Sequence, residues 1–175
     1  MELQTRKPNR LKNYDYSQNG AYFITICVQD RKPILSQIIV GEGLAPPVLK
    51  LLPFGECIKE QINNLEIRYE NVKIDNYVIM PNHIHILMRI ENQTGGASPS
   101  PTISRIIQQF KGYVTKQIGE SIWEKLYYDH IIRDDIDYQQ IWQYIDENPT
   151  KWADYIGIAT RFDTDDRWSP LRQSY

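Results

Sequence analysis

Two histidines separated by one residue are the sharpest chemical feature of this sequence. His83 and His85 flank Ile84 in an otherwise apolar run. If that run is a β-strand, both imidazoles project from one face and Ile84 from the other, towards a core. Neighbouring imidazoles can clamp a divalent metal ion, but two ligands do not complete a site. Taken alone, the pair fits histidines hydrogen-bonded at a sheet surface at least as well.

A tyrosine and an asparagine four residues apart form the second feature. Tyr144 and Asn148 would project from one face of a helix, with Gln140 one turn earlier. An amide oxygen is a suitable ligand for Mg²⁺ or Mn²⁺, and a tyrosine hydroxyl can act as a nucleophile. The chain has 12 tyrosines, however, and a helical tyrosine commonly packs against a core. The spacing alone therefore does not identify a site.

The elements that must position these residues alternate between strand and helix patterns. Apolar and β-branched runs predict strands, whereas apolar residues at helical spacing predict helices. We expect strands at 21–29, 72–80, 83–90 and 127–132, helices at 54–68, 102–118 and 136–148, and a peripheral hairpin pairing 38–40 with 48–51. Without the hairpin, the first six elements follow the ferredoxin-like βαββαβ order. We therefore expect an α+β sandwich, an antiparallel sheet with two helices on one face, plus an extra C-terminal helix that carries Tyr144.

Several residues mark where the expected helices begin and end. Ser100 or Thr102 can cap the second helix, which Gly119 ends, and Asp134 or Asp135 can cap the third. Pro149 is expected to end the third helix, because the residue before a proline is pushed out of the α region, although a few further helical residues can follow at 151–155. On this interpretation Asn148 lies at a frayed helix end.

Composition predicts one domain over residues 1–175, with a basic arm at 1–19 and a polar tail at 156–175. No apolar run is long enough to cross a bilayer and no signal peptide is recognisable, so a cytoplasmic protein is expected. The net charge of −2 counts against a nucleic-acid-binding protein, but an acidic chain can still present a basic surface. The candidate DNA-contacting cations cluster in the arm and the second helix: Arg6, Lys7, Arg10, Lys12, Arg105, Lys111 and Lys116. A solvated helix face explains the last three equally well.

Four ordered motifs together resemble a known family. Residues 77–86 (YVIMPNHIHI) look like the HUH motif of the single-tyrosine transposases, and the MPNHIH form is typical of their REP-associated branch. Residues 123–133 (WEKLYYDHIIR) resemble the WE-x-x-Y-x-D-x-IIR stretch of that branch, and 144–149 (YIDENP) its Y-I-x-x-NP element. The opening, from Arg10-Leu11 to GAYFITI, is also similar. The resemblance covers roughly residues 10–149.

The resemblance implies a ferredoxin-like fold and a metal-dependent cleavage of single-stranded DNA beside a hairpin. It assigns His83, His85 and Asn148 as ligands of Mg²⁺ or Mn²⁺ and Tyr144 as the nucleophile. The product would be a 5′-phosphotyrosine with a free 3′-OH that later rejoins a strand. Arg133, the last residue of the 123–133 stretch, joins the candidate DNA contacts. The resemblance leaves open a monomer or a homodimer.

Other interpretations remain beside this one. Tyr113 in the basic second helix has Gln117 four residues later, so spacing does not exclude it as the nucleophile, and only the resemblance favours Tyr144. His130 is better explained by a structural role. The main alternative function is a non-catalytic, nucleic-acid-binding ferredoxin-like module, and a histidine metal site without DNA is a third.

Overall fold

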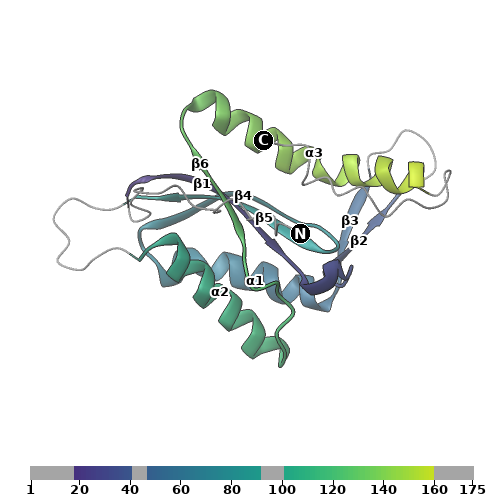
Figure 1. Ribbon diagram of the computed structural model, residues 1–175, viewed down its shortest axis with the longest axis horizontal. Coiled ribbons are helices and arrows are strands. Elements are labelled where there is room, and N and C mark those ends of the chain that lie inside the picture. The colour runs from purple at the N-terminus through teal and green to yellow at the C-terminus, as the bar shows by residue number, and fades with distance from the viewer. Residues whose placement is uncertain (1–17, 41–46, 92–100, 160–175) are drawn as a thin grey trace, which may run out of the picture.

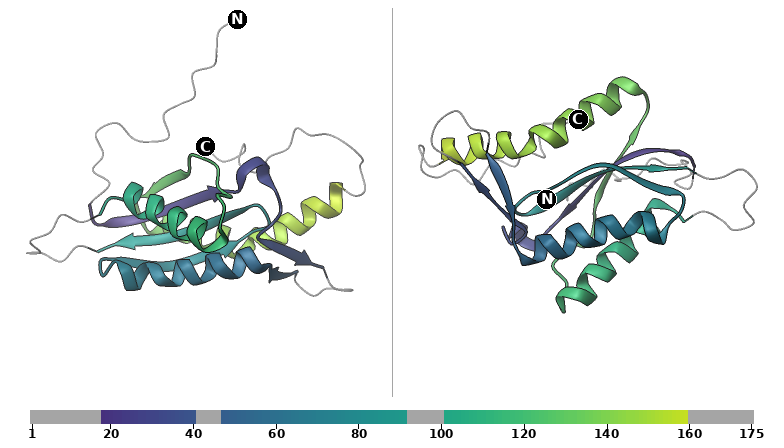
Figure 2. Two further views of the ribbon diagram at one scale, coloured as in Figure 1. Left: turned by 90° about the horizontal axis from the view of Figure 1, so that it is seen from below. Right: turned by 180° about the vertical axis from the view of Figure 1, so that it is seen from behind.

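A four-stranded antiparallel sheet separates two layers of helix (Figure 1). The computed structural model describes residues 18–40, 47–91 and 101–159. The strand order is β4-β5-β1-β6, from β1 (Gly20–Cys27), β4 (Val72–Ile79), β5 (His83–Ile90) and β6 (Tyr128–Ile132). Helices α1 (Pro53–Arg68) and α2 (Ile103–Ile118) cover one face, and α3 (Asp135–Ala159) crosses the other (Figure 2). The expected ferredoxin-like α+β sandwich is confirmed.

Both faces of the central strands are buried, which explains why β1 and β5 read as almost continuous apolar runs. Alternate side chains, such as Ile24 of β1 and Ile84 of β5, pack beneath α1 and α2. The intervening side chains face α3, where a smaller core joins Phe23, Leu87, Ile141 and Ile145. The larger core therefore holds the sandwich together, whereas the smaller core fixes the position of α3.

The helix boundaries follow the expected capping chemistry with one exception. The Thr102 hydroxyl accepts a hydrogen bond from the backbone N–H of Arg105 at 3.4 Å, and Gly119 ends α2 in the left-handed conformation with φ 95°. The Asp134 carboxylate accepts from the N–H of Asp137 at 2.8 Å and so caps α3. These three assignments confirm the sequence predictions.

The prediction that Pro149 ends the third helix is wrong. Helix α3 continues through Pro149 to Ala159, into the segment expected to be tail. An interior proline removes one backbone hydrogen bond and crowds the preceding turn, at a cost of about 3 kcal/mol. The turn beyond the proline is nevertheless held against the sheet, where the Trp152 ring lies 5.7 Å from the His83 ring. Asn148 consequently lies within a continuous helix and is buried rather than frayed.

Polar contacts pin the N-terminal half of α3 to β4. The Tyr138 hydroxyl donates to Asp75 at 2.9 Å, and the Asn76 amide donates to Asp146 at 2.8 Å. A register shift between Ile74 and Asn76 interrupts the ladder of β4 here. Such a bulge changes the direction of the strand locally, and Asp75 and Asn76, neighbours in sequence, both bond to α3.

The peripheral hairpin also forms as expected. Strands β2 (Ser36–Ile39) and β3 (Val48–Leu51) pair with each other and stand apart from the main sheet, after the short 3₁₀ turn η1 (Gln29–Arg31). Gly55 lets α1 approach this region, because a Cβ there would lie 2.1 Å from the Leu35 carbonyl oxygen. In the described part of the chain, no helix has the length and apolarity to cross a bilayer.

The packing of α3 on the sheet leads to a prediction about stability. Ile145 is 1% exposed between α3 and the sheet, so Ile145→Ala should lower the free energy of unfolding by about 2–5 kcal/mol in urea denaturation. Ile136, on the same helix, is 71% exposed, and Ile136→Ala should change it by less than about 0.5 kcal/mol. Equal effects of the two substitutions would contradict the observed docking of α3.

Candidate active site

The two histidines of β5 lie beneath α3. His83 pairs with Cys27 of β1 and His85 with Thr25, so both imidazoles share the sheet face that α3 covers. Ile84, between them, packs into the opposite core. His83 is 5% exposed and His85 is fully buried. The predicted one-sided arrangement is confirmed, but the pair lies at an interior interface rather than on an open sheet surface.

Each imidazole is oriented by a hydrogen bond to its Nδ1 atom. Asn82 Oδ1 lies 2.7 Å from Nδ1 of His83, and Thr25 Oγ1 lies 2.8 Å from Nδ1 of His85. The Nε2 atoms then face each other at 3.1 Å. One consistent pattern has His83 donating to Asn82, His85 donating through Nε2 to His83, and the Thr25 hydroxyl donating to His85. A threonine hydroxyl can also accept, so it would serve either tautomer of His85.

Burial keeps both histidines neutral. It lowers the pKa of His83 to about 3, with a smaller contribution from the positive charge of Arg31. The pKa of His85 lies well below its usual range, first because of burial, then because of His83 and Arg31. A neutral imidazole with a free nitrogen is the form that binds metal ions.

The spacing of the two imidazoles fits a shared metal ligand set. Two nitrogens bound to one ion at about 2.0–2.1 Å, with bond angles near 90–110°, lie about 2.8–3.4 Å apart, and the two Nε2 atoms are separated by 3.1 Å. Hydrogen bonds to the outer ring nitrogens are the usual support of metal-bound histidines. Among the described residues no cluster of three histidine, cysteine or acidic side chains adds to the pair. Within the described residues, a third protein ligand would therefore be of another type, such as an amide.

Helix α3 presents three functional side chains in one stripe to this pair. Tyr144, Asn148 and Trp152 are spaced four residues apart, so they line one side of the helix. The Tyr144 ring lies 5.3 Å from the His85 ring, and the Trp152 ring lies 5.7 Å from that of His83, between centroids. Asn148, 7% exposed, lies one turn from each. The helix therefore places the predicted amide ligand between the predicted nucleophile and a tryptophan, over the two imidazoles.

Phe23 contacts both the imidazole and the phenol rings. Its ring stacks on His85 at 5.0 Å with an interplanar angle of 27°, and it meets the Tyr144 ring edge-on at 5.9 Å. The Lys151 ammonium lies 5.7 Å from the centroid of the Tyr144 ring and 2.9 Å from the Glu147 carboxylate. Tyr144 thus has aromatic and cationic neighbours, while its side chain stays half-exposed.

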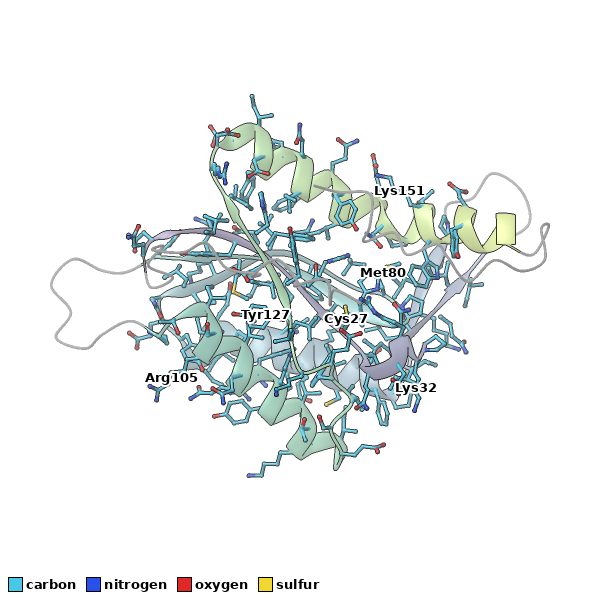
Figure 3. All side chains as sticks on the ribbon, in the orientation of Figure 1. Cys27, Lys32, Met80, Arg105, Tyr127 and Lys151 are labelled. Carbon is cyan, nitrogen blue, oxygen red and sulfur yellow. The ribbon has the colours of Figure 1, made fainter. Side chains whose placement is uncertain are left out.

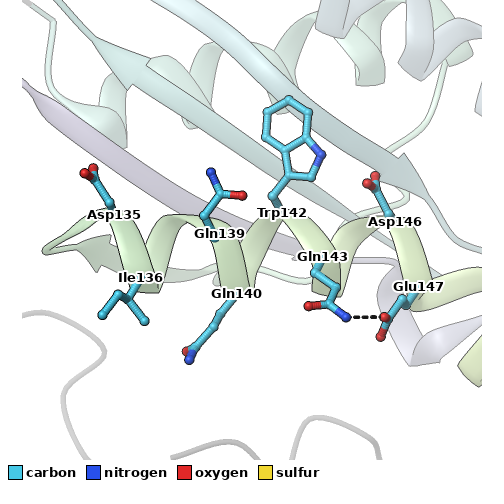
Figure 4. Close-up of a pocket in the computed structure, with 8 residues that line it drawn as sticks. All are labelled: Asp135, Ile136, Gln139, Gln140, Trp142, Gln143, Asp146 and Glu147. Carbon is cyan, nitrogen blue, oxygen red and sulfur yellow. Dashed lines mark hydrogen bonds between the residues drawn. The ribbon is translucent and has the colours of Figure 1, made fainter.

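The outer surface of α3 has a different character. A shallow pocket runs along it (Figure 4), lined by amides, carboxylates and two apolar side chains: Asp135, Ile136, Gln139, Gln140, Trp142, Gln143, Asp146 and Glu147. Gln140 belongs to this surface and is exposed, although sequence spacing suggested that it shares the face of Tyr144. The carboxylates disfavour a DNA backbone here.

The predicted DNA-contacting residues fall into separate places. Arg105 and Lys116 are exposed on α2, across the sheet from the histidines. Lys111, also on α2, donates to the backbone carbonyls of Glu124 and Leu126 at 3.0 and 3.1 Å, and burial lowers its pKa. Arg133 is exposed just before α3. Arg6, Lys7, Arg10 and Lys12 lie outside the described residues.

The structure also shows where the two alternative candidate residues, Tyr113 and His130, lie. Tyr113 projects from α2, on the far side of the sheet, where the Arg68 guanidinium lies 3.9 Å from its ring centroid. His130 Nε2 lies 2.8 Å from an oxygen of Asp137, linking β6 to the first turn of α3. Tyr144 is therefore the tyrosine beside the histidine pair, and His130 has the structural role expected for it.

Sequence reasoning missed three residues of the site. Thr25 and Asn82 orient the imidazoles, and Trp152 covers His83. Trp152 had a signal, since it continues the four-residue spacing of Tyr144 and Asn148, but the expected helix end at Pro149 hid it. Thr25 had no such signal in the sequence, because its contact with His85 depends on strand register. Figure 3 shows the side chains that lie between the sheet and α3.

Comparison with known proteins gives a consistent pattern. An uncharacterised protein of Haemophilus influenzae is 34% identical over 170 residues, covering 86% of this chain and 91% of that protein. A candidate REP-associated tyrosine transposase of the same organism is 28% identical over 160 residues, covering 85% and 81%. A solved structure of a REP-associated tyrosine transposase bound to a REP hairpin shares the fold, with a TM-score of 0.59 and 20% identity over 81% of this chain and 73% of that one. No family model matches the chain.

Neutral buried histidines make a prediction about pH. Below pH 6.5 the unfolded chain takes up protons on both imidazoles, whereas the pKa of folded His83 is about 3 and that of His85 is also lowered. Stability is therefore full above about pH 6.5 and falls on acidification, by up to about 1.4 kcal/mol per pH unit for each histidine. Urea denaturation of metal-free protein between pH 7 and 5 should show this fall. The double variant His83→Gln/His85→Gln should flatten it by about 2 kcal/mol per pH unit, and parallel curves would contradict the neutral state.

Proposed function

The chain belongs to the REP-associated tyrosine transposases, and from this premise we propose that it nicks and rejoins single-stranded DNA through Tyr144. One observation carries the proposal. The Tyr144 ring lies 5.3 Å from His85, whose Nε2 faces that of His83 at 3.1 Å. A half-exposed phenol beside two neutral, converging imidazoles is an arrangement suited to attack on a metal-bound phosphate.

We assign a role to each residue in that reaction. His83, His85 and Asn148 would hold Mg²⁺ or Mn²⁺, which neutralises charge on the phosphate oxygens when bound. The Tyr144 oxygen attacks phosphorus, a bond forms between them, and the bond from phosphorus to the 3′ oxygen breaks. The products are a 5′-phosphotyrosine and a strand with a free 3′-OH. Attack by a 3′-OH on the phosphotyrosine reverses these bonds and restores the phenol, which rejoins DNA without an external energy source.

The substrate that we propose is a DNA hairpin with a single-stranded flank. The solved relative is bound to a REP hairpin, and Tyr144 requires a strand whose backbone can reach a site partly covered by α3. The basic residues Arg6, Lys7, Arg10 and Lys12, together with Arg133, are proposed contacts to phosphates outside the cleavage site. Arg105 and Lys116 can contact only DNA that passes the opposite face of the sheet.

One chain supplies the whole proposed constellation. The histidines of β5 and the stripe of α3 contact each other within a single copy. We therefore propose that the reaction takes place in cis, so that a monomer suffices for cleavage whatever the oligomeric state of the protein.

A nicking assay tests the function. Full-length protein incubated with a labelled hairpin oligonucleotide carrying single-stranded flanks and Mn²⁺ should give a protein–DNA adduct that survives denaturing electrophoresis. Tyr144→Phe removes the attacking oxygen and should lower adduct formation at least about 10³-fold. Tyr113→Phe is the matched control, which should leave the adduct unchanged. Chelation by EDTA should abolish the adduct, and added Mn²⁺ should restore it.

Each contrary result has a distinct meaning. Binding of the oligonucleotide without any adduct would support the non-catalytic module instead. Loss of the adduct in Tyr113→Phe but not in Tyr144→Phe would show that Tyr113, and not Tyr144, is the nucleophile. An adduct that forms in EDTA would refute the role proposed for the metal.

A further inference from the structure

The loop that follows β1 contains two consecutive residues in the left-handed conformation. Asp30 and Arg31 have φ values of 57° and 53°, and they are the only residues other than glycine with positive φ in the described part of the chain. This backbone conformation is unfavourable for residues other than glycine, asparagine and aspartate. Strain of this kind persists where the surrounding structure imposes it, commonly at functional sites.

Backbone hydrogen bonds fasten this loop to the turn that precedes the histidines. Val28 N–H donates to the Asn82 carbonyl and Leu35 N–H to the Pro81 carbonyl, both at 2.9 Å. On the other side, Gln29 N–H donates to the Ile122 carbonyl at 2.8 Å. Arg31 therefore has a backbone position fixed relative to Asn82, which itself orients His83.

The guanidinium of Arg31 is held by an exchangeable partner. Its Nε atom lies 3.1 Å from Glu124 Oε1, and both side chains are 40% exposed. An ion pair this exposed contributes little to stability. A guanidinium matches a phosphate as well as it matches a carboxylate, because its planar donors can bind two oxygens at once. A phosphate can therefore replace Glu124 without leaving a buried charge unpaired.

Glu124, the partner of Arg31, is also fixed beside the strand that carries His83. Its backbone N–H donates to the Cys27 carbonyl at 2.9 Å, and Cys27 is paired with His83 between β1 and β5. Lys151 of α3 lies beside the Tyr144 ring, and it too is paired with a half-exposed carboxylate, that of Glu147. The two cations thus come from different elements, the loop after β1 and helix α3.

We propose that Arg31 is a phosphate-binding residue of this site, which leaves Glu124 to contact the backbone of single-stranded DNA next to the scissile bond. The inference rests on the proposed function. The backbone bonds to Pro81 and Asn82 hold the Arg31 loop against the turn that leads into His83, and Glu124 occupies the guanidinium until DNA binds. In a purely structural role, by contrast, the same ion pair would only join the loop to residues 122–124.

Two variants that break the same ion pair distinguish these roles. Arg31→Gln removes the cation, whereas Glu124→Gln removes the competing carboxylate and leaves the cation free. Both are made in a Tyr144→Phe chain, so that binding is measured without cleavage. The probe is a fluorescein-labelled hairpin oligonucleotide with single-stranded flanks, titrated by fluorescence anisotropy at several salt concentrations.

We expect opposite effects. Arg31→Gln should weaken binding about 10-fold and reduce the slope of log affinity against log salt by about 0.7, the value for one phosphate contact on a single strand. Glu124→Gln should bind as tightly as the parent or up to about threefold more tightly. The thermal midpoints of the two variants should be alike, because each loses the same exposed pair. Arg31→Lys, which keeps the charge but not the planar donors, should fall between Arg31→Gln and the parent.

Equal losses of affinity in Arg31→Gln and Glu124→Gln would overturn the proposal in favour of a structural ion pair. Unchanged affinity and salt slope in Arg31→Gln would overturn it as well. If the parent chain failed to bind the oligonucleotide and the unsubstituted protein formed no adduct, the proposed function itself would fail, which is distinguishable from failure of the Arg31 assignment alone.

Discussion

Burial of two neutral imidazoles between a sheet and a helix is the constraint on which the rest of this site depends. Both histidines stay neutral there, because burial lowers the pKa of each, the positive charge of Arg31 adds to this, and His83 further lowers the pKa of His85. Their polar atoms must instead be satisfied locally, and Asn82, Thr25 and the facing Nε2 atoms provide this. The outcome is a pair of neutral, facing nitrogens, the form that the proposed metal site requires, rather than two protonated side chains that repel each other.

Helix α3 converts that pair into a candidate catalytic site. Apolar packing of Ile141 and Ile145 and the hydrogen bonds of Tyr138 and Asp146 to β4 fix the helix in register. The stripe that ends in Trp152 then falls over the histidines. Tyr144 keeps some exposure, which the proposed nucleophile needs in order to meet a polymeric substrate, while the proposed ligands His83, His85 and Asn148 are buried. The buried side of α3 thus fixes the position of the helix, whereas half-exposed Tyr144 remains accessible to a substrate.

The sequence predicted most of this fold, because strands buried on both faces and amphipathic helices leave strong periodic signals. It also predicted His83, His85, Tyr144 and Asn148 as one site, through motifs far apart in the chain. What it could not predict depends on tertiary contacts. Pro149 was expected to end α3, but the helix continues to Ala159, and its next turn packs through Trp152 against His83. The hydrogen bond between Thr25 and His85 depends on strand register. The ion pair between Arg31 and Glu124 joins two segments that lie 93 positions apart in the chain.

The most direct test of the central claim is crystallographic. Crystals of the full chain soaked in Mn²⁺ would be measured at a wavelength where manganese scatters anomalously. The account predicts one anomalous peak at about 2.0–2.3 Å from Nε2 of both His83 and His85, with the Asn148 amide oxygen and the Tyr144 hydroxyl turned towards it in the same chain. A peak located elsewhere, or unliganded imidazoles that keep their mutual hydrogen bond at saturating Mn²⁺, would contradict it.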